Sequence, residues 1–544
     1  MATQWARIYR SPARWSPWEK SVAAAVALYF IWPLLTTRSI ANIVDSVESS
    51  SRSTLSSLDL ETRFDRSIIL SEKEQKADEV LARIRSTESL AFQVSGTFPP
   101  HLRFPVAKPL MEESELYTLL RQMPKGGILH GHLEAMVDMK WLINTTVEGE
   151  HGSTCFVRYE EKTVPTFDQA VARKEKFAFF KFASSSSGLP PDEGWATCKE
   201  VRDAFPGGAN AYDSHLELQN SVIRDIFKND DAAWAQFLMS FEMLGSILRY
   251  DPMFEAYIGR LIQQFYEDGI LYVEIRMFKW ETYLANGDTK PFSAVLRSVR
   301  RIVAKFKQTH PDFQDLRFVW QEVRSLDNSV IAASIGEAIQ YRKSHPDQIV
   351  ALDLVGHEVT RSLDEVLQTL VQGQRTAKRA GVSLPLVLHA GETQRCGPAP
   401  DANLVDALLL GTKRIGHGIA LSRHPGLIKR VIDQNIAVEV APISNQMLGY
   451  VKDLREHPVI DLLLSGVQVT LAPDDPMLYG YEGVTPDYYQ VYMAFESLDL
   501  RSLKQLSLNG ITFSGLTRAE QRTAKIVWDR RWKDWVDFVI ASGK

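Results

Sequence analysis

Four apolar runs of this chain each end in polar groups that can bind a metal ion or move a proton, and this pattern constrains the fold most. The runs end at His130 and His132, at His389, at His417, and at Asp474 and Asp475. His130 and His132 are one residue apart in an extended segment, so both side chains point to the same side and can reach one ion. A lone H-x-H is more often a pair of core histidines. Four such runs in one chain favour a shared site.

Short β-like runs separated by helical patterns predict the fold. After the opening strand they occupy residues 271–275, 318–320, 349–354, 386–389, 414–417, 437–440 and 467–471. Eight strands that alternate with helices indicate an α/β protein, a (β/α)8 TIM barrel. Active groups of such barrels lie at the C-terminal ends of the strands, where all the polar groups named above are found.

Composition limits the function. The chain has 544 residues, of which 45% are hydrophobic and 24% charged, as in soluble globular proteins. The net charge of -5 shows no excess of basic residues, which argues against nucleic acid as a partner. The only cysteines are Cys155, Cys198 and Cys396, so a metal must be held by nitrogen and oxygen. Cys155 and Cys198 could pair, but in a cytosolic protein all three would be buried thiols.

The N-terminal segment has the features of an export signal. A basic leader precedes the uncharged apolar residues 21–37, and the small residues Ser39 and Ala41 follow. We interpret residues 1–41 as a secretory signal peptide that is cleaved after Ala41. A type II membrane anchor and a buried N-terminal helix are the alternatives. Either form of export places the remaining chain outside the cytosol.

The remaining chain divides into three parts. Residues 42–120 are helical in pattern, with an N-terminal cap at Ser71, and form a packing or dimer-forming arm. Residues 121–142 and 216–544 form the barrel. Residues 143–215 form an insert after the first barrel strand, and serine and proline make its centre loop-like. Asn144 in the insert is an N-x-T glycosylation acceptor if the chain is exported.

The strand-end residues suit a zinc site with an open position for water. The expected ligands are His130, His132, His389 and Asp474. Zinc lowers the pKa of a bound water to about 7 and so supplies hydroxide at neutral pH. No G-x-S-x-G elbow offers a serine nucleophile instead.

Three further groups are candidates for proton transfer and substrate binding. Glu392 lies near the metal and can carry a proton to a ring nitrogen of the substrate, although it could also cap the next helix. His417 can orient or deprotonate the attacking water, and a core histidine is the alternative. The adjacent carboxylates Asp474 and Asp475 repel each other unless one binds the ion and the other a substrate N–H. A turn before Pro476 is the plainer explanation.

Seven motifs occur in a fixed order along the chain. They are M-P-K-G-G from Met123, H-G-H from His130, D-L-V-G-H-E from Asp353, H-A-G-E-T from His389, R-I-G-H-G from Arg414, P-I-S-N-Q from Pro442 and D-D-P from Asp474. This set resembles the adenosine deaminases, most closely their secreted adenosine deaminase 2, or adenosine deaminase-related growth factor, branch. The resemblance runs from about residue 60 to the C-terminus. It implies a TIM barrel of the metal-dependent hydrolase type. It also implies zinc-dependent deamination of adenosine, and of 2′-deoxyadenosine, to inosine and ammonia.

The resemblance also assigns roles to individual residues. It implies one zinc ion on His130, His132, His389 and Asp474. Glu392 would protonate purine N1 while His417 holds the attacking hydroxide. Asp475 would hydrogen-bond N7, and the backbone N–H of Gly356 would donate to N3. Trp234 would line the pocket, although a core tryptophan is an equal alternative.

Other implications concern the sugar and the partners. Glu134 replaces an aspartate that contacts the ribose 5′-hydroxyl, and Val323 stands where the secreted branch has a ribose-side histidine. The insert resembles that branch's receptor-binding domain, in which the counterparts of Cys155 and Cys198 are bridged. It would bind a cell-surface receptor or glycan. The arm resembles a dimerisation segment and implies a homodimer.

Two alternatives to adenosine deamination keep the same scaffold. The substrate could be another adenine nucleoside, an N6-substituted adenosine or a nucleotide. A nucleotide would need cations near its 5′ end, and no Arg or Lys cluster adjoins the strand-end motifs. The protein could also be a non-enzymatic, growth-factor-like ligand. The complete set of metal-binding and proton-transfer residues argues against that.

Overall fold

The computed structural model describes residues 57–543, except 59, 150–153, 166–171, 187–188, 190–193, 223–229 and 398. The predicted signal or anchor, residues 1–41, lies outside the described residues. The chain divides into a unit that ends at Arg66 and a compact unit from Ser67 to Lys544, which holds every element discussed below. Within the described ranges, no helix combines the length and the apolar character that crossing a membrane requires.

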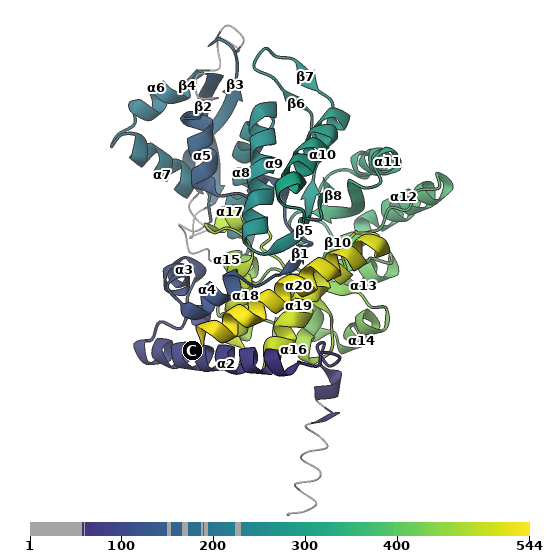
Figure 1. The fold of residues 1–544 in the computed structure, drawn as a ribbon. Coiled ribbons are helices and arrows are strands. Elements are labelled where there is room, and N and C mark those ends of the chain that lie inside the picture. The colour runs from purple at the N-terminus through teal and green to yellow at the C-terminus, as the bar shows by residue number, and fades with distance from the viewer. Residues whose placement is uncertain are drawn as a thin grey trace, which may run out of the picture. The chain divides into compact units, whose positions relative to one another are not determined.

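Two four-stranded parallel sheets form the centre of the second unit (Figure 1). The first contains, side by side, β1 (Gly126–Ile128), β5 (Ile270–Met277), β8 (Asp315–Val323) and β9 (Ile349–Val355). The second contains β10 (Val387–Ala390), β11 (Arg414–His417), β12 (Ala437–Val440) and β13 (Val469–Leu471). Bridges from Leu352 to Leu386 and from Gly131 to Asp474 join the sheets on both sides. The ring is therefore closed, and the predicted (β/α)8 barrel is confirmed.

Helices fill the intervals between the strands and cover the outside of the barrel (Figure 1). They include α9 (Asp251–Glu267), α10 (Phe292–Thr309), α11 (Asn328–Ser344), α12 (Leu367–Arg379), α13 (Ala399–Leu409), α14 (Pro425–Asp433), α16 (Val459–Leu464) and α19 (Leu500–Thr512). On α10, for example, Phe292, Val295 and Val299 are buried. Because both faces of a parallel sheet are covered, its strands form the continuous apolar runs seen in the sequence.

The first barrel strand is shorter than the sequence pattern predicts. β1 ends at Ile128, but the backbone remains extended, and His132 has φ −113° and ψ 126°. Gly131 bridges to Asp474, and His132 bridges to Arg276. A Cβ at Gly131 would lie 2.6 Å from the Met136 side chain, so a larger residue here would force that side chain to move. Both histidines therefore still reach the end of the barrel.

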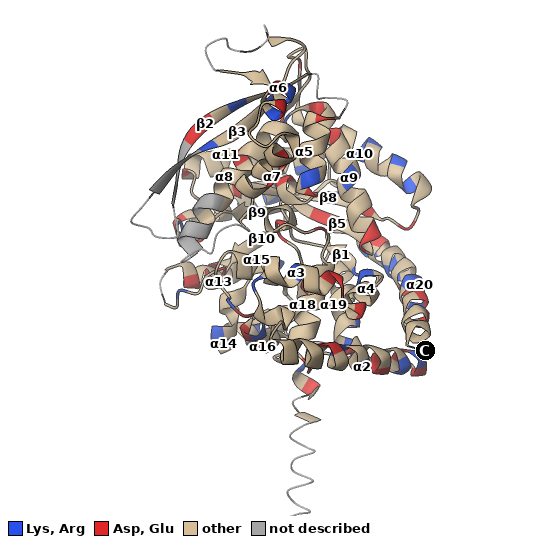
Figure 2. Ribbon diagram, turned by 90° about the vertical axis from the view of Figure 1, so that its left-hand side faces the viewer, with Lys and Arg blue, Asp and Glu red and all other residues tan. Residues whose placement is uncertain are grey.

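The helical arm packs against the C-terminal helices. It contains α2 (Glu72–Ser95), α3 (Phe104–Glu112) and α4 (Glu115–Arg121), and Ser71 caps α2 as predicted. The Glu74 carboxylate accepts a 2.8 Å bond from the indole of Trp532 on α20 (Arg518–Ser542) and pairs with Lys504. Figure 2 shows both signs of charge along α2 and α20. The dimer-forming role of the arm stays a prediction.

The insert forms an antiparallel sheet of β2 (Cys155–Pro165), β3 (Ala172–Phe182) and β4 (Ala196–Thr197), with α6 (Cys198–Asp203) and α7 (Ala209–Gln219). A disulfide joins Cys155 to Cys198, with a Cα–Cα distance of 5.4 Å. β3 packs on α8 (Asp230–Leu248), where the backbone N–H of Phe180 donates to Ser246 Oγ at 3.0 Å. The expected start of the insert at residue 143 falls inside α5 (Met139–Val147).

Candidate metal centre

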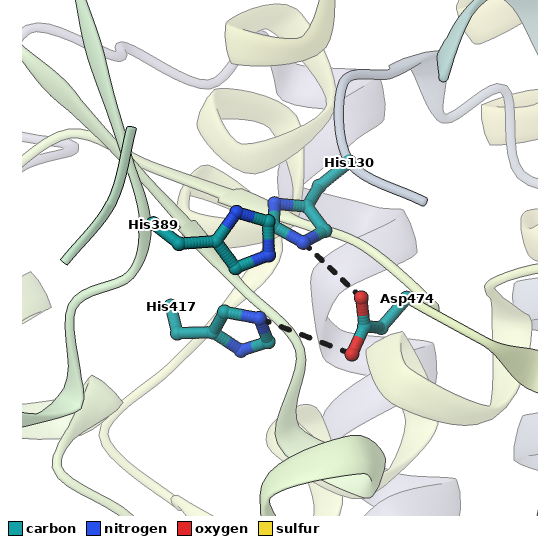
Figure 3. Close-up of side chains that lie close together, drawn as sticks. All are labelled: His130, His389, His417 and Asp474. Atoms are coloured by element: carbon teal, nitrogen blue, oxygen red, sulfur yellow. Dashed lines mark ion pairs between the residues drawn. The ribbon is translucent and has the colours of Figure 1, made fainter. Parts of the chain in front are cut away.

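Four histidines and Asp474 converge at the C-terminal ends of the barrel strands; Figure 3 shows three of these histidines with Asp474. Asp474 Oδ1 lies 3.1 Å from Nε2 of His130 and 3.4 Å from Nε2 of His132. Asp474 Oδ2 lies 3.9 Å from Nε2 of His417. The His389 ring centroid is 4.6 Å from that of His130. All five side chains are buried, so the structure brings together the predicted ligands and His417.

The outer nitrogens of three of these histidines face hydrogen-bond acceptors. The pairs are His130 Nδ1 with Glu439 Oε2 (2.7 Å), His132 Nδ1 with Gln321 Oε1 (2.9 Å) and His389 Nδ1 with Asp353 Oδ2 (2.6 Å). A neutral ring that donates from Nδ1 has its lone pair on Nε2. Three lone pairs therefore meet the Asp474 carboxylate. Within the described part of the chain, Nε2 of His130 has no hydrogen-bond partner. This donor set suits a divalent cation.

Charges behind the histidines keep two of these acceptors ionised. Burial by itself would raise the pKa of both Asp353 and Glu439. Contact with His389 and Arg276 instead holds the pKa of Asp353 well below its usual range, and Arg276 and Arg414 do the same for Glu439. The Arg276 guanidinium donates to Glu439 Oε2 at 2.7 Å and to Asp353 Oδ2 at 3.1 Å. Burial lowers the pKa of His389 to about 3, so the ring is neutral, as a metal ligand must be.

His417 differs from the other three histidines. Its Nδ1 faces the amide nitrogen of Asn445 at 3.2 Å, which is a donor and not an acceptor. Burial keeps the pKa of His417 well below its usual range, so the ring is neutral. His417 (φ 59°) and Asp474 (φ 60°) both have the left-handed backbone that non-glycine residues rarely adopt. Such strain is typical of functional sites, where the surrounding structure holds a side chain in one direction.

A pocket of about 210 Å³ opens onto the cluster. Glu392, Asp475, Gly356 and Trp234 line it, as does Val323. The other lining residues are His132, Phe237, Leu238, Phe241, Phe278, Gln321, Val355, His389, His417 and Asp474. The sequence predicted Glu392, Asp475, Gly356 and Trp234 at the site, and their roles stay predictions.

The remaining predicted site residue, Glu134, lies on the short helix Leu133–Ala135. It is buried, which raises the pKa of its carboxyl to about 7, and it is not one of the described residues around the pocket. Its predicted contact with the ribose stays a prediction.

Part of the pocket lining is aromatic. The Trp234 ring stacks on His357 with centroids 5.1 Å apart, and its Nε1 donates to the Tyr450 hydroxyl at 2.7 Å. Phe237 and Phe241 come from the same helix, α8. The sequence predicted Trp234 here but not the two phenylalanines. The Phe237 ring lies edge to face with the rings of Trp234 and Phe241. Together these rings form an apolar, aromatic surface of the kind that binds an aromatic base.

Glu392 and Asp475 are acids held close to the cluster. Glu358 accepts the backbone N–H groups of Gly391 (3.0 Å) and Glu392 (2.9 Å), which fixes the loop after β10. The next helix begins at Ala399, so Glu392 does not cap it. Burial and the charge of Asp474 raise the pKa of Asp475 well above its usual range. Within the described chain neither oxygen of Asp475 has a hydrogen-bond partner, so both are available to a ligand.

The sequence analysis missed the residues behind the metal ligands, namely Gln321, Asp353, Glu439 and Arg276. A signal was present, because Arg276, Asp353 and Glu439 are ionisable residues inside otherwise apolar strands. Charged side chains are almost never buried unless they are paired.

Comparisons with known proteins find relatives that match most of the chain. A family model described as Adenosine deaminase matches residues 211–527. Adenosine deaminase 2 of Homo sapiens is 34% identical, covering 86% of this chain and 89% of that protein. An adenosine deaminase of Lutzomyia longipalpis is 31% identical, covering 86% and 89%. The crystal structure of an adenine deaminase from Arthrobacter aurescens has a TM-score of 0.50 at 18% identity, covering 76% of this chain and 99% of that one.

We expect Asp353→Asn to weaken metal binding about 10- to 100-fold, because an amide no longer fixes the His389 ring with its lone pair on Nε2. Competition with a chromophoric chelator measures the affinity. Asp315→Asn is the matched control, since it makes the same change at the other end of the strands, where Asp315 pairs with Arg317. Equal affinities for wild type and Asp353→Asn would contradict this assignment.

Proposed function

This chain belongs to the adenosine deaminase family, and on that premise we propose that it hydrolyses adenosine, and 2′-deoxyadenosine, to inosine and ammonia. The carrying observation is the convergence of three imidazole lone pairs and one carboxylate at the end of an aromatic-walled pocket. A protein that served only as a binding platform would need neither this donor set nor the buried acids beside it. We therefore favour an enzyme over a growth-factor-like ligand.

We propose that the metal is zinc and that His130, His132, His389 and Asp474 hold it. A divalent cation bound there supplies hydroxide near neutral pH by lowering the pKa of a water molecule. Three neutral imidazoles and one carboxylate are a ligand set that suits zinc. Elemental analysis of the purified protein is expected to find one zinc per chain. One equivalent of a different metal, with no zinc, would contradict the proposal.

The remaining residues bind and protonate the base. Glu392 gives a proton to N1 of the purine, which makes C6 more open to attack by water. Asp475, whose oxygens have no partner in the described protein and whose pKa is raised, engages N7. Gly356 offers its backbone N–H to N3, and its φ of 99° suits glycine alone. Trp234 forms part of the aromatic wall.

We expect Glu392→Gln to lower kcat on adenosine by about 100-fold or more, because an amide cannot supply the proton. The fall in absorbance as adenosine becomes inosine measures the rate. Glu322→Gln makes the same change on β8, outside the residues that line the pocket, and is the control. A Glu392→Gln variant that keeps its metal and full activity would show that another group protonates the base.

The pocket favours a nucleoside over a nucleotide. Among the described residues that line it there is no lysine or arginine, while Glu392, Asp474 and Asp475 are acidic. A 5′-phosphate would therefore meet no basic side chain in the described lining of the pocket. Solved structures of similar fold include an N6-mAMP deaminase of arabidopsis at 14% identity and a TM-score of 0.50, so the barrel alone does not decide between these substrates.

We accordingly expect kcat/KM for AMP to be at least about 100-fold lower than for adenosine. A panel of adenosine, 2′-deoxyadenosine, N6-methyladenosine and AMP at matched concentrations measures this preference. Comparable values for AMP and adenosine would favour the alternative of a nucleotide deaminase on the same scaffold.

We also propose that the protein acts outside the cell, as a homodimer, and that the insert binds a cell-surface receptor or glycan. The Cys155–Cys198 disulfide supports an oxidising location. Asn144 is exposed, as a glycosylated residue must be. The insert has its own antiparallel sheet, which is separate from the barrel strands and so leaves a distinct surface for a partner.

A further inference from the structure

A chain of hydrogen bonds leads away from His417 to the start of α16. The backbone N–H of Val459 donates to Nδ1 of His457 at 3.0 Å. Nε2 of His457 lies 3.1 Å from Oδ1 of Asn445, and Nδ2 of Asn445 lies 3.2 Å from Nδ1 of His417. The three side chains are buried, so the contacts are sheltered from water.

Each hydrogen bond in this chain has only one available direction. A backbone N–H can only donate, so Nδ1 of His457 accepts from Val459. Burial lowers the pKa of His457 to about 3, and a neutral ring that accepts at Nδ1 has its proton on Nε2. That proton is donated to Oδ1 of Asn445, which turns the amide NH₂ group toward His417. Nδ1 of His417 must then accept.

We propose that Asn445 and His457 are positioning residues that hold His417 in the tautomer with its proton on Nε2. The proposal rests on the proposed deaminase function and assigns His417 one of its two candidate roles. Nε2 is the nitrogen that faces Asp474, and the His417 side chain lines the pocket. With a proton there, His417 donates a hydrogen bond to the oxygen of the attacking water. It cannot also take the proton of that water, which must pass to one of the carboxyl groups of the pocket.

The contrast with the neighbouring histidines supports this assignment. His130, His132 and His389 have acceptors behind them, and so present lone pairs to the centre. His417 has a donor behind it, and so presents an N–H. Oε1 of Glu392 is the nearest competing acceptor for Nδ1, but at 3.5 Å it is at the limit of a hydrogen bond. The partner behind each ring therefore separates the three metal ligands, which have an acceptor there, from His417, which has a donor there.

The ¹⁵N NMR spectrum of the metal-loaded protein, labelled at its histidine rings, tests the tautomer directly. The His417→Gln and His457→Gln variants assign the two sets of ring signals. We expect both rings to be neutral, with the proton on Nε2 and a bare Nδ1. A His417 ring with its proton on Nδ1, or one that averages the two forms, would overturn the proposal.

Two substitutions test the effect of this hydrogen-bond chain on catalysis. Asn445→Asp places an acceptor behind His417 and is expected to move the proton to Nδ1 and to lower kcat by about 100-fold or more, with KM little changed. His457→Leu frees the Asn445 amide to rotate, and an average of both tautomers with about 10-fold lower kcat is expected. His457→Gln, which can accept from Val459 and donate to Asn445, is the matched control and is expected to restore the wild-type tautomer and rate.

The outcomes separate this inference from the proposed function. If the wild-type protein deaminates adenosine but carries the His417 proton on Nδ1, the proposed function stands and the positioning role of Asn445 and His457 is wrong. A wild-type protein without activity on adenosine contradicts the function, whatever the tautomer. If His457→Leu fails to fold, the wild-type spectrum and Asn445→Asp still decide. Equal rates for His457→Leu and His457→Gln in folded protein would show that His457 has no positioning role.

Discussion

The buried guanidinium of Arg276 is the interaction on which the metal centre depends. It donates to the backbone oxygen of Leu129 at 2.8 Å and to the carboxylates of Asp353 and Glu439, and so connects the segment after β1 with β5, β9 and β12. Its side chain has no exposed surface. Burying such charges is costly, and removing one partner from a buried pair typically costs about 3–5 kcal/mol. Removing any one of these charged side chains is therefore expected to destabilise the others.

The same network sets the chemistry of the metal ligands. Because Arg276 keeps Asp353 and Glu439 ionised, both accept from the histidines in front of them, and the lone pairs of those rings face inward. Arg414 extends the pairing from Glu439 to Glu274 deeper in the barrel. The usual interior of such a barrel is layers of branched apolar side chains. Here charged side chains occupy part of that interior. Their hydrogen bonds orient the histidine rings more strictly than packing alone.

The sequence predicts the barrel and the residues at its open end because both depend on local patterns. The strands are apolar runs, and polar groups such as His389 and Asp474 lie at their ends, which a parallel barrel gathers at one face. The pairing of Asp353 with His389, or of Asn445 with His417, is set by the register of distant strands and loops. No local pattern contains that information. For the same reason, H-G-H does not show that β1 stops at Ile128.

Asp474 follows the last barrel strand and His130 follows the first, and the bridge at Gly131 closes the ring between them. During translation His130 is therefore synthesised long before Asp474. While the chain is still emerging, the histidines near its start have no carboxylate to face, and the interior charges lack part of their network. Capture of the ion is consequently a late event in biogenesis, and a truncated nascent chain that lacks β13 is incompetent for it however well its earlier strands have formed.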